Sequence, residues 1–364
     1  LGGPVAASLR EHCFNNLQID YAVLGEGEIT IVELLSTLSA GEVPSSVQGI
    51  GYRSPDGQTL FTPARPLMQT LDDVPQIDYS MFPMKSLLGN ANGVVQVHTQ
   101  RGCPNSCTFC FNCFRVSSSK VRYRKPEHVI NEIEFLNKHH EVSLFALSGE
   151  CITMNKKWLI TFCKNLMAKN LNIKYRITSR VDCVDEERMH WLTQSGCEMI
   201  SFGLESGSNE ILKRMGKNAK VEQGLAAVQL SQKYIPRVEA SIMLGYLGET
   251  KKTLQETETF CRKINVLPHF FYATPFPGTV LYQEALQRGL IPDEQSYMLS
   301  LDKSSIFRRM KVNLTDMPDS EAEQRISALV RRVNRHYLLK SLGTQLLSKV
   351  MRSIRENGIQ GTVK

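Results

Sequence analysis

The chain has 364 residues, of which 42% are hydrophobic and 22% charged, and this balance excludes a disordered or fibrous protein. Its length exceeds twice the common domain size, so we expect one large domain joined to a smaller one. No apolar run is long enough to cross a membrane, and the N-terminus lacks the basic flank of a signal peptide, which predicts a cytoplasmic protein. The net charge of +7 lies in the tail, because residues 301–364 hold 13 Lys and Arg against 6 Asp and Glu.

Residues 1–61 are predicted to be the C-terminal remnant of an α/β domain together with a hairpin. The first residue reads as the end of a buried strand that runs into Gly2 and Gly3. A helix to about residue 15, a strand over 19–24, Gly25 and Gly27, a helix over 29–38 and a hairpin made of 47–52 and 59–61 follow. Residues 62–93 contain four prolines and no strong periodic pattern, so they are predicted to be a linker without helix or strand.

Strands alternate with helices over residues 94–290, which indicates a parallel sheet. The predicted strands span 94–99, 142–147, 173–178, 198–203, 238–244 and 267–274. The predicted helices span 126–139, 155–169, 185–194, 250–263 and 280–288, with two more that begin at Ser208 and Val221. Six closely spaced βα units favour an α/β fold with a partial (β/α)6 barrel, in which the chemistry gathers at the carboxyl ends of the strands.

Residues 291–364 are predicted to form a basic helical C-terminal region, with amphipathic helices over 322–338 and 342–354. A basic segment suits nucleic acid, an anionic membrane surface or an acidic partner. A solvated helical face is the commoner case, and no nucleic-acid-binding signature accompanies this segment.

Ten cysteines in a cytoplasmic chain are expected to be reduced rather than joined as disulfides. Six lie apart in mostly apolar or helical contexts and are predicted to pack as small hydrophobes: Cys13, Cys151, Cys163, Cys183, Cys197 and Cys261. The other four crowd one loop just after the first barrel strand, at Cys103, Cys107, Cys110 and Cys113.

The spacing of Cys103, Cys107 and Cys110 lets one loop wrap a metal cluster. Three thiolates on a four-iron cube leave one iron free for another molecule. Two alternatives stay open at this point. One is chance clustering, and the other is a structural zinc site with Cys113 as the fourth ligand, although zinc prefers paired short spacings.

The CxxxCxxC loop, with Phe109 before its last cysteine, resembles that of the radical S-adenosylmethionine (SAM) enzymes. The resemblance extends to later segments in the order found in the cobalamin-associated branch of that family: 121–125, 179–182, 203–207, 245–250 and 274–279. It implies that the three thiolates hold a [4Fe-4S] cluster whose free iron chelates SAM. In that family the reduced cluster splits SAM to a 5′-deoxyadenosyl radical, which removes a hydrogen atom from an unreactive carbon.

The first 61 residues are similar to the C-terminal end of that branch's cobalamin-binding domain. The resemblance implies that Gly2, Gly3, Gly25 and Gly27 lie against cobalamin in the intact protein, because glycines at strand ends let the backbone approach a bulky flat cofactor. We expect that the upstream part of this domain, with the loop that would ligate cobalt or bind the nucleotide tail, is missing from the chain.

The same resemblance implies that Phe109, Gly149 and Glu150 contact the cluster and SAM. Gly149 and Glu150 follow the second barrel strand, where the family has a Gly-Gly-Glu turn against the SAM amino group, and Ser148 replaces the first glycine here. Arg180 follows the third strand and is expected to offer its planar fork to the SAM carboxylate, with a surface ion pair as the alternative.

Glu205 follows the fourth strand and is expected to accept hydrogen bonds from the ribose hydroxyls, while Gly203 lets the backbone come close. The alternative is that Glu205 only caps the next helix. Gly245, after the fifth strand, is expected on the adenine side. His98 precedes the cysteine loop and is predicted to be a packed core histidine rather than a ligand.

These features predict a radical SAM enzyme that delivers a methyl group from methylcobalamin to an unactivated carbon. A cobalamin-dependent cyclase or rearrangement enzyme of the tetrapyrrole type is the alternative within the family. A third hypothesis is a metal-stabilised module whose basic tail binds nucleic acid. The expected cofactors are a [4Fe-4S] cluster, SAM and, in the intact protein, cobalamin. The expected partners are a small-molecule substrate and a one-electron reductant of the flavodoxin or ferredoxin type.

Overall fold

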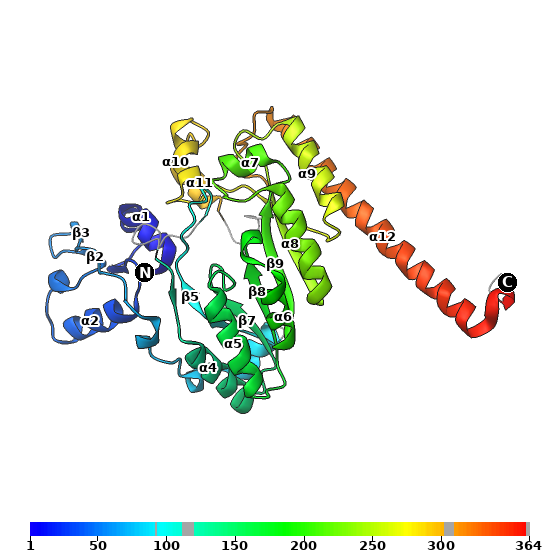
Figure 1. Ribbon diagram of the computed structural model, residues 1–364. Helices are drawn as coiled ribbons and strands as arrows, with labels where there is room; N and C mark the ends of the chain where they lie inside the picture. The colour runs from blue at the N-terminus through cyan, green and yellow to red at the C-terminus, as the bar shows by residue number, and fades with distance from the viewer. Residues whose placement is uncertain (92, 111–119, 302–308, 362–364) are drawn as a thin grey trace.

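Figure 1 shows the computed structural model, which describes residues 1–91, 93–110, 120–301 and 309–361. At its centre is a parallel sheet of six strands whose order in space follows their order in sequence. The strands are β4 (Val94–His98), β7 (Leu144–Ser148), β8 (Lys174–Ser179), β9 (Cys197–Glu205), β10 (Arg237–Leu244) and β11 (His269–Tyr272). The predicted partial barrel is therefore confirmed, with β4 and β11 as the two edges of the sheet.

Helices follow each strand of the sheet. They are α4 (Pro126–His140), α5 (Lys156–Ala168), α6 (Glu186–Gln194), α7 (Asn209–Arg214), α8 (Val221–Tyr234), α9 (Lys251–Lys263) and α10 (Val280–Gln287). Helices α4 to α9 connect successive strands, and α10 comes after the last strand, β11. The main hydrophobic core lies between these helices and the sheet, and it includes Val97 and Phe145 from the strands and Ile133 and Leu159 from the helices. All four of these side chains are completely buried.

Side-chain caps fix where several of these helices begin, and so where the strands before them end. Asn155 accepts a hydrogen bond from the Trp158 N–H at 3.0 Å to start α5, and Asp185 accepts one from the Arg188 N–H at 2.8 Å to start α6. Thr250 caps α9 in the same way. Such caps satisfy backbone donors that have no partner inside the helix.

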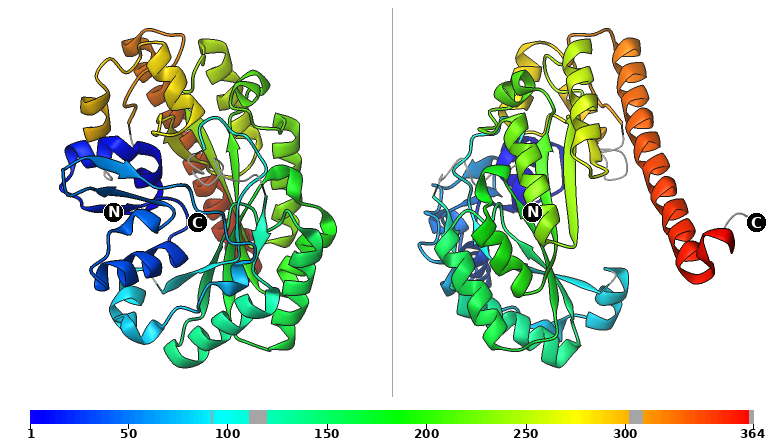
Figure 2. Two further views of the ribbon diagram at one scale, coloured as in Figure 1. Left: turned by 90° about the vertical axis from the view of Figure 1, so that its left-hand side faces the viewer. Right: turned by 45° about the vertical axis from the view of Figure 1, so that its right-hand side comes forward.

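The N-terminal segment lies on the opposite side of the sheet from helices α5, α6 and α8 (Figure 2). It comprises α1 (Gly3–Asn16), β1 (Tyr21–Val23), α2 (Glu28–Ser39), β2 (Ile50–Arg53) and β3 (Thr59–Phe61), with a short 3-10 turn at Pro44–Ser46. The three strands form a small antiparallel sheet, and β2 and β3 make the predicted hairpin. The Val23 N–H donates to the Leu1 carbonyl oxygen at 2.8 Å, so the first residue runs beside β1 as a strand end would.

The prediction that residues 62–93 lack helix or strand is wrong in one place, because α3 spans Met84–Asn90. Short 3-10 turns at Leu71–Asp73 and Tyr79–Met81 precede it. The segment is also fastened to the barrel: the buried Tyr79 hydroxyl donates to Glu132 on α4 at 2.6 Å. Over its described residues, the segment 62–93 therefore contributes no strand to a sheet, as its prolines lead us to expect, but it is attached to the barrel.

The C-terminal region contains α11 (Glu294–Leu299) and a single helix, α12 (Asp319–Gly361), where two helices were predicted. Gly343 lies near the expected break, but a glycine inside a helix costs only about 1 kcal/mol and does not end it. The first half of α12 packs along α9 through Ala322, Ile326, Leu329 and Val333, which are 0–1% exposed. Beyond this contact the helix extends away from the barrel (Figure 1).

Over the described part of the chain, every helix is either too short or too polar to serve as a bilayer crossing.

Candidate active site

The loop that carries Cys103, Cys107 and Cys110 closes a two-stranded ladder between β5 (Gln100–Arg101) and β6 (Arg122–Tyr123). At the start of this loop Gly102 has a φ of +94°, and a Cβ there would lie 2.5 Å from the Lys120 carbonyl oxygen. A side chain at this position would force the two ends of the loop apart.

Thr108 fixes the middle of the loop to the barrel. Its N–H donates to the Met215 carbonyl oxygen at 2.9 Å, and its carbonyl oxygen accepts from the Leu281 N–H at 2.9 Å. The Thr108 and Tyr246 hydroxyls share a further hydrogen bond. Phe109 packs edge-on against Tyr246, with ring centroids 6.3 Å apart. The aromatic residue of the motif therefore anchors the loop, and its contact with a cofactor stays a prediction.

The three cysteines of the loop are the donor set that the sequence predicts for a metal cluster. Cys103 and Cys107 are partly exposed and Cys110 is exposed, and the Asn105 amide donates to the Cys103 sulfur at 3.4 Å. Among the described residues, no three His, Cys, Asp or Glu side chains converge on one metal ion. A four-iron cluster is wider than one ion and takes its thiolates at separate corners. Cys113, the fourth ligand of the zinc alternative, lies outside the described residues.

Cys107 lies near two cations and a carboxylate: Arg180 after β8, Lys217 after α7 and Glu205 at the end of β9. Burial raises the pKa of its thiol, while the positive charges of Lys217 and Arg180 act in the opposite direction. The Glu205 carboxylate lies in the same neighbourhood and adds a smaller upward influence. An anionic group held at this cysteine would thus have two positive charges beside it.

Glu205 forms an ion pair with Lys217, and Gly203 makes room for it. The Lys217 ammonium donates to the Glu205 carboxylate at 2.8 Å and to the Gly203 carbonyl oxygen at 2.5 Å. A Cβ on Gly203 would overlap the carboxylate and lie 3.1 Å from the ammonium nitrogen. Glu205 has a φ of +65°, a rare conformation for a residue with a side chain. Its carboxylate binds Lys217, so the helix-cap alternative is not what the structure shows.

Arg180 follows β8, as the sequence predicts, but its guanidinium binds a carboxylate of the protein rather than facing an open ligand site. Its Nε and Nη2 donate to the two carboxylate oxygens of Asp182, each at 2.9 Å, and Nη2 also donates to the Asn218 carbonyl oxygen at 3.2 Å. The ion-pair alternative is therefore present, although Arg180 is buried rather than at the surface. A ligand carboxylate would have to share this guanidinium with Asp182.

A cavity of about 800 Å³ lies between the N-terminal segment and the inner face of the sheet. Gly25 and Gly27 border it on one side, and Gly149 and Glu150 border it at the end of β7. No atom lies within 4 Å of where a Cβ on Gly25 would be, so a ligand can approach the backbone there. Four of the predicted cofactor-binding residues thus share one cavity.

The prediction of a packed core histidine is wrong for His98, whose side chain is exposed and lines this cavity. Its Nδ1 shares a 2.9 Å hydrogen bond with the hydroxyl of Ser148, its partner in register on β7. Enclosure by the cavity walls, followed by the charge of Arg101, lowers the pKa of the imidazole. Because side chains alternate along a strand, the pairing of His98 with Gln96 on one face could have revealed this position.

A second cavity of about 430 Å³ adjoins the first. The two share Gln96, His98 and Arg101 in their linings, and the second is bordered on its far side by Leu71 and Ile77 from the segment before α3. His98 therefore stands where the two cavities meet.

Three other predicted residues occupy different places. Gly245 lies after β10, where a Cβ would be 3.4 Å from the Met310 sulfur, and its N–H donates to Glu249 at 2.7 Å. Gly2 and Gly3 lie at the start of α1 with no atom within 4 Å of their Cβ positions. Their contacts with cofactors stay predictions.

Cys151 and Cys183 depart from the role of isolated hydrophobes. Cys151 is fully buried after the end of β7, and Cys183 is partly exposed in the 3-10 turn Val181–Cys183 after β8. The neighbouring Cys183 thiol lowers the pKa of Cys151, against the effect of burial. The Cys151 sulfur also bonds the Thr153 hydroxyl at 3.3 Å.

Sequence reasoning missed two charged residues that organise the site. Lys217 follows α7 with no motif around it, and only the fold brings it to Cys107. Glu26 stands between Gly25 and Gly27, and the reasoning assigned roles to these glycines alone. A carboxylate between two predicted cofactor-binding glycines was the signal that could have found it.

Residues 97–261 match the model of the family described as the Radical SAM superfamily. This segment is a radical SAM domain. It contains the three cysteines of the loop, Arg180, Lys217 and Glu205. The family resemblance inferred from the cysteine spacing is therefore confirmed.

Similarity to known proteins extends beyond the radical SAM domain. An uncharacterized methyltransferase of Pyrococcus horikoshii is 31% identical over 75% of this chain and 59% of its own length. The anaerobic magnesium-protoporphyrin IX monomethyl ester cyclase of Rubrivivax gelatinosus is 28% identical over 94% of this chain and 64% of its own length. The chain thus spans about three fifths of these curated relatives.

A solved structure has the same fold. The radical SAM methyltransferase TsrM from Kitasatospora setae, with cobalamin and a [4Fe-4S] cluster bound, superposes with a TM-score of 0.67 at 16% identity. The superposition covers 80% of this chain and 58% of that one, which is more than the radical SAM domain alone.

Proposed function

We propose that the intact protein is a cobalamin-dependent radical SAM enzyme that transfers a methyl group to an unactivated carbon. The observation that supports this most directly is the cavity shared by the two parts of the molecule. Gly25 and Gly27 of the N-terminal segment face His98 and Glu150 of the radical SAM domain across it. A cofactor held by one part would there meet a substrate held by the other.

The residues present fit the cofactors that the family implies. Cys103, Cys107 and Cys110 would hold a [4Fe-4S] cluster, and Gly25 offers an open backbone edge to cobalamin. When bound, the cluster with SAM supplies radical chemistry and cobalamin supplies the methyl group.

Protein groups around the loop suit a ligand with several charges. The guanidinium of Arg180 and the ammonium of Lys217 lie beside Cys107, each shared with a carboxylate of the protein, and can donate hydrogen bonds to a ligand carboxylate or an anionic cluster. Glu205 accepts hydrogen bonds at the end of β9, as ribose hydroxyls require. Glu150, at the end of β7, can face an ammonium group.

A cobalamin-dependent cyclase acting on a tetrapyrrole is the second candidate, and one observation favours it. The Rubrivivax relative that bears a cyclase name aligns over 94% of this chain, including the N-terminal segment. For either reaction we expect a small-molecule substrate, a flavodoxin or ferredoxin as electron donor, and a cytoplasmic location.

The decisive experiment is anaerobic reconstitution with iron and sulfide, followed by SAM, a strong reductant and chromatography of the nucleoside products. Formation of 5′-deoxyadenosine by the wild type and its loss in Cys107→Ala would support the cluster assignment. Cys13→Ala, which alters a buried cysteine of the N-terminal segment, is the matched control and should retain activity. Protein that carries the cluster but leaves SAM intact would contradict the proposal.

The two candidate reactions are separated by adding methylcobalamin to the same assay. S-adenosylhomocysteine whose formation depends on cobalamin supports methyl transfer. 5′-Deoxyadenosine as the sole nucleoside product, with cobalamin present, favours the cyclase.

A further inference from the structure

Glu26 is the most heavily hydrogen-bonded carboxylate of the N-terminal segment in the described structure. One oxygen accepts from Arg122 Nη2 at 2.9 Å and from Arg101 Nη1 at 3.1 Å. The other oxygen accepts from Arg122 Nη1 at 2.9 Å and from the Met68 N–H at 3.0 Å. The side chains of Glu26 and Arg122 are each only 6% exposed. Arg122 and Glu26 thus form a bidentate ion pair that is almost fully shielded from water, and hydrogen bonds between charged groups are strong in such surroundings.

The two arginines stand at the two ends of the cysteine loop. Arg101 is on β5 and Arg122 is on β6, and they are directly opposite each other in the ladder that closes the loop. Cys103 follows Arg101 by two residues. Glu26 therefore lies across the neck of the loop, although it belongs to a different part of the chain.

From this arrangement we infer that Glu26 is a positioning residue that holds the neck of the cysteine loop closed. The inference rests on the proposed function, since it takes Cys103 and Cys107 to be cluster ligands. It goes further by assigning to the N-terminal segment a role in shaping the cluster site in addition to any role with cobalamin.

The charge balance at the neck explains why a carboxylate is needed. Like charges directly opposite each other in an antiparallel pair destabilise it, and Arg101 opposes Arg122. Glu26 accepts hydrogen bonds from both arginines and supplies one negative charge, and Glu28, which also binds Arg101, supplies the second. Without Glu26 the guanidiniums of Arg101 and Arg122 would still face each other in the ladder. Arg122 is buried, and among the described residues it binds no carboxylate other than Glu26.

The ionisation of Glu26 agrees with this role. Burial raises the pKa of the carboxyl, but the hydrogen bonds from Arg122, the Met68 N–H and Arg101 outweigh it and hold the pKa below its usual value. The group is therefore charged at neutral pH, when it must balance the arginines.

The test uses the iron-free full chain, so that it does not depend on cofactor chemistry. Glu26→Gln keeps the size of the side chain and removes its charge. We expect Cys103 and Cys107 to react with iodoacetamide about tenfold faster than in the wild type, because loss of a buried ion partner favours local opening. Peptides covering 100–110 and 120–123 should lose hydrogen-exchange protection in parallel.

Glu33→Gln is the matched control, because it removes another ion-paired carboxylate of the N-terminal segment, the partner of Arg65, and leaves the arginines of the loop neck untouched. Its cysteines should react at the wild-type rate. Glu26→Asp keeps the charge on a shorter side chain and should restore part of the protection. Equal alkylation rates in Glu26→Gln and wild type, with circular dichroism unchanged, would overturn the inference.

If Glu26→Gln fails to fold, Glu28→Gln replaces it. That variant frees only Arg101, and we expect faster alkylation confined to Cys103 on the Arg101 side of the loop. No increase at Cys103 would then overturn the inference. The two proposals can fail separately. If the wild-type protein assembles no cluster, the proposed function is rejected. If Glu26→Gln is nevertheless alkylated faster than the wild type, the positioning role of Glu26 still holds.

Discussion

Lys217 donates a 2.8 Å hydrogen bond to the Glu205 carboxylate in the space left by the missing side chain of Gly203. The two side chains are 7% and 14% exposed, so the pair is held largely out of water. The sequence suggested that Gly203 lets a cofactor approach the backbone, but in the structure the space at Gly203 is filled by the Glu205–Lys217 ion pair. This pair fixes the orientation of the carboxylate expected to bind ribose.

Replacing Gly203 with Ala should displace this carboxylate without unfolding the protein. The overlapping atom lies at the end of the flexible Glu205 side chain, which can move, whereas the backbone φ of residue 203 is not in the left-handed region. We expect SAM to bind about tenfold more weakly, since one hydrogen bond to a charged group contributes roughly 1.5–3 kcal/mol. Titration calorimetry on the reconstituted protein measures this change.

Gly89→Ala, in open space on α3, is the control for that substitution and should bind SAM as the wild type does. Unchanged SAM affinity in Gly203→Ala would show that the Glu205–Lys217 pair does not contribute to the SAM site.

Glu249 should make the protein less stable as the pH rises. Its side chain is completely buried, one of its oxygens has no hydrogen-bond partner among the described residues, and burial raises its pKa from 4.5 to about 8. A carboxyl whose pKa is raised by folding stabilises the protonated folded state, and this contribution is lost as the pH rises through the folded-state pKa.

The loss between the two pKa values should be on the order of 5 kcal/mol in the free energy of unfolding. Glu249→Gln cannot ionise, so its stability should vary less across this range and exceed that of the wild type on the alkaline side. Urea denaturation on both sides of the range makes the comparison. Parallel pH profiles for the two proteins would contradict the assignment.

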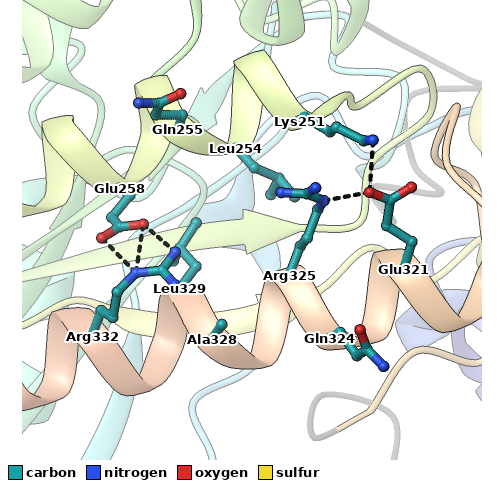
Figure 3. Close-up of a pocket in the computed structure, with 10 residues that line it drawn as sticks. All are labelled: Lys251, Leu254, Gln255, Glu258, Glu321, Gln324, Arg325, Ala328, Leu329 and Arg332. Atoms are coloured by element: carbon teal, nitrogen blue, oxygen red, sulfur yellow. Dashed lines mark hydrogen bonds and ion pairs between the residues drawn. The ribbon is translucent and has the colours of Figure 1, made fainter.

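The contact between α9 and α12 should depend on its apolar residues rather than on its ion pairs. Figure 3 shows the groove between the two helices, where Arg332 binds Glu258 and Lys251 binds Glu321. Leu254 and Leu329 line the same groove. Arg332→Ala should cost about 1 kcal/mol or less in the free energy of unfolding, because its side chain is 53% exposed.

Ile326→Ala removes a completely buried side chain from the same helix and should cost about 2–5 kcal/mol. Chemical denaturation of the two variants gives the comparison. A larger loss for Arg332→Ala than for Ile326→Ala would show that the ion pairs hold α12 in place.

His98 should remain neutral at physiological pH. Its pKa is lowered first by enclosure in the cavity and then by the charge of Arg101. A titration of the ring signals by nuclear magnetic resonance, assigned with His98→Gln, should give a midpoint below the usual 6.5.

The same variant should retain iron content and SAM cleavage within about twofold, since His98 lines the cavity and is outside the loop. A midpoint above 6.5 would mean that a nearby carboxylate, such as Glu132 or Glu150, dominates the site.

The βα alternation could be predicted from the sequence because each strand and helix has its own periodic pattern. Even the caps at Asp185 and Thr250 lie where the predicted helices begin. The single helix α12 was predicted as two helices with a break at residues 339–341, whereas the structure continues the helix through these residues.

The site was predictable where one short segment carries the chemistry, as at Cys103, Cys107 and Cys110. It was less predictable where partners come from distant segments. Arg180 has the expected place, but its pairing with Asp182 depends on how the turn after β8 folds back. Lys217 and Glu26 act through contacts that join separate elements, and a local motif does not encode such contacts.

The succession of strands in the sheet bears on how the chain acquires its structure. Each strand from β4 to β11 pairs with the next strand of the parallel sheet along the chain. Every pairing therefore closes one local connection, although the cysteine loop is inserted between β4 and β7 and a second helix between β9 and β10. Short closures are inexpensive in chain entropy and allow the sheet to grow in the direction of synthesis. The contact of Glu26 with Arg122 spans 96 positions and needs both the N-terminal segment and the ladder to be in place. Assembly of the cysteine loop is therefore expected late, after the sheet that supports it.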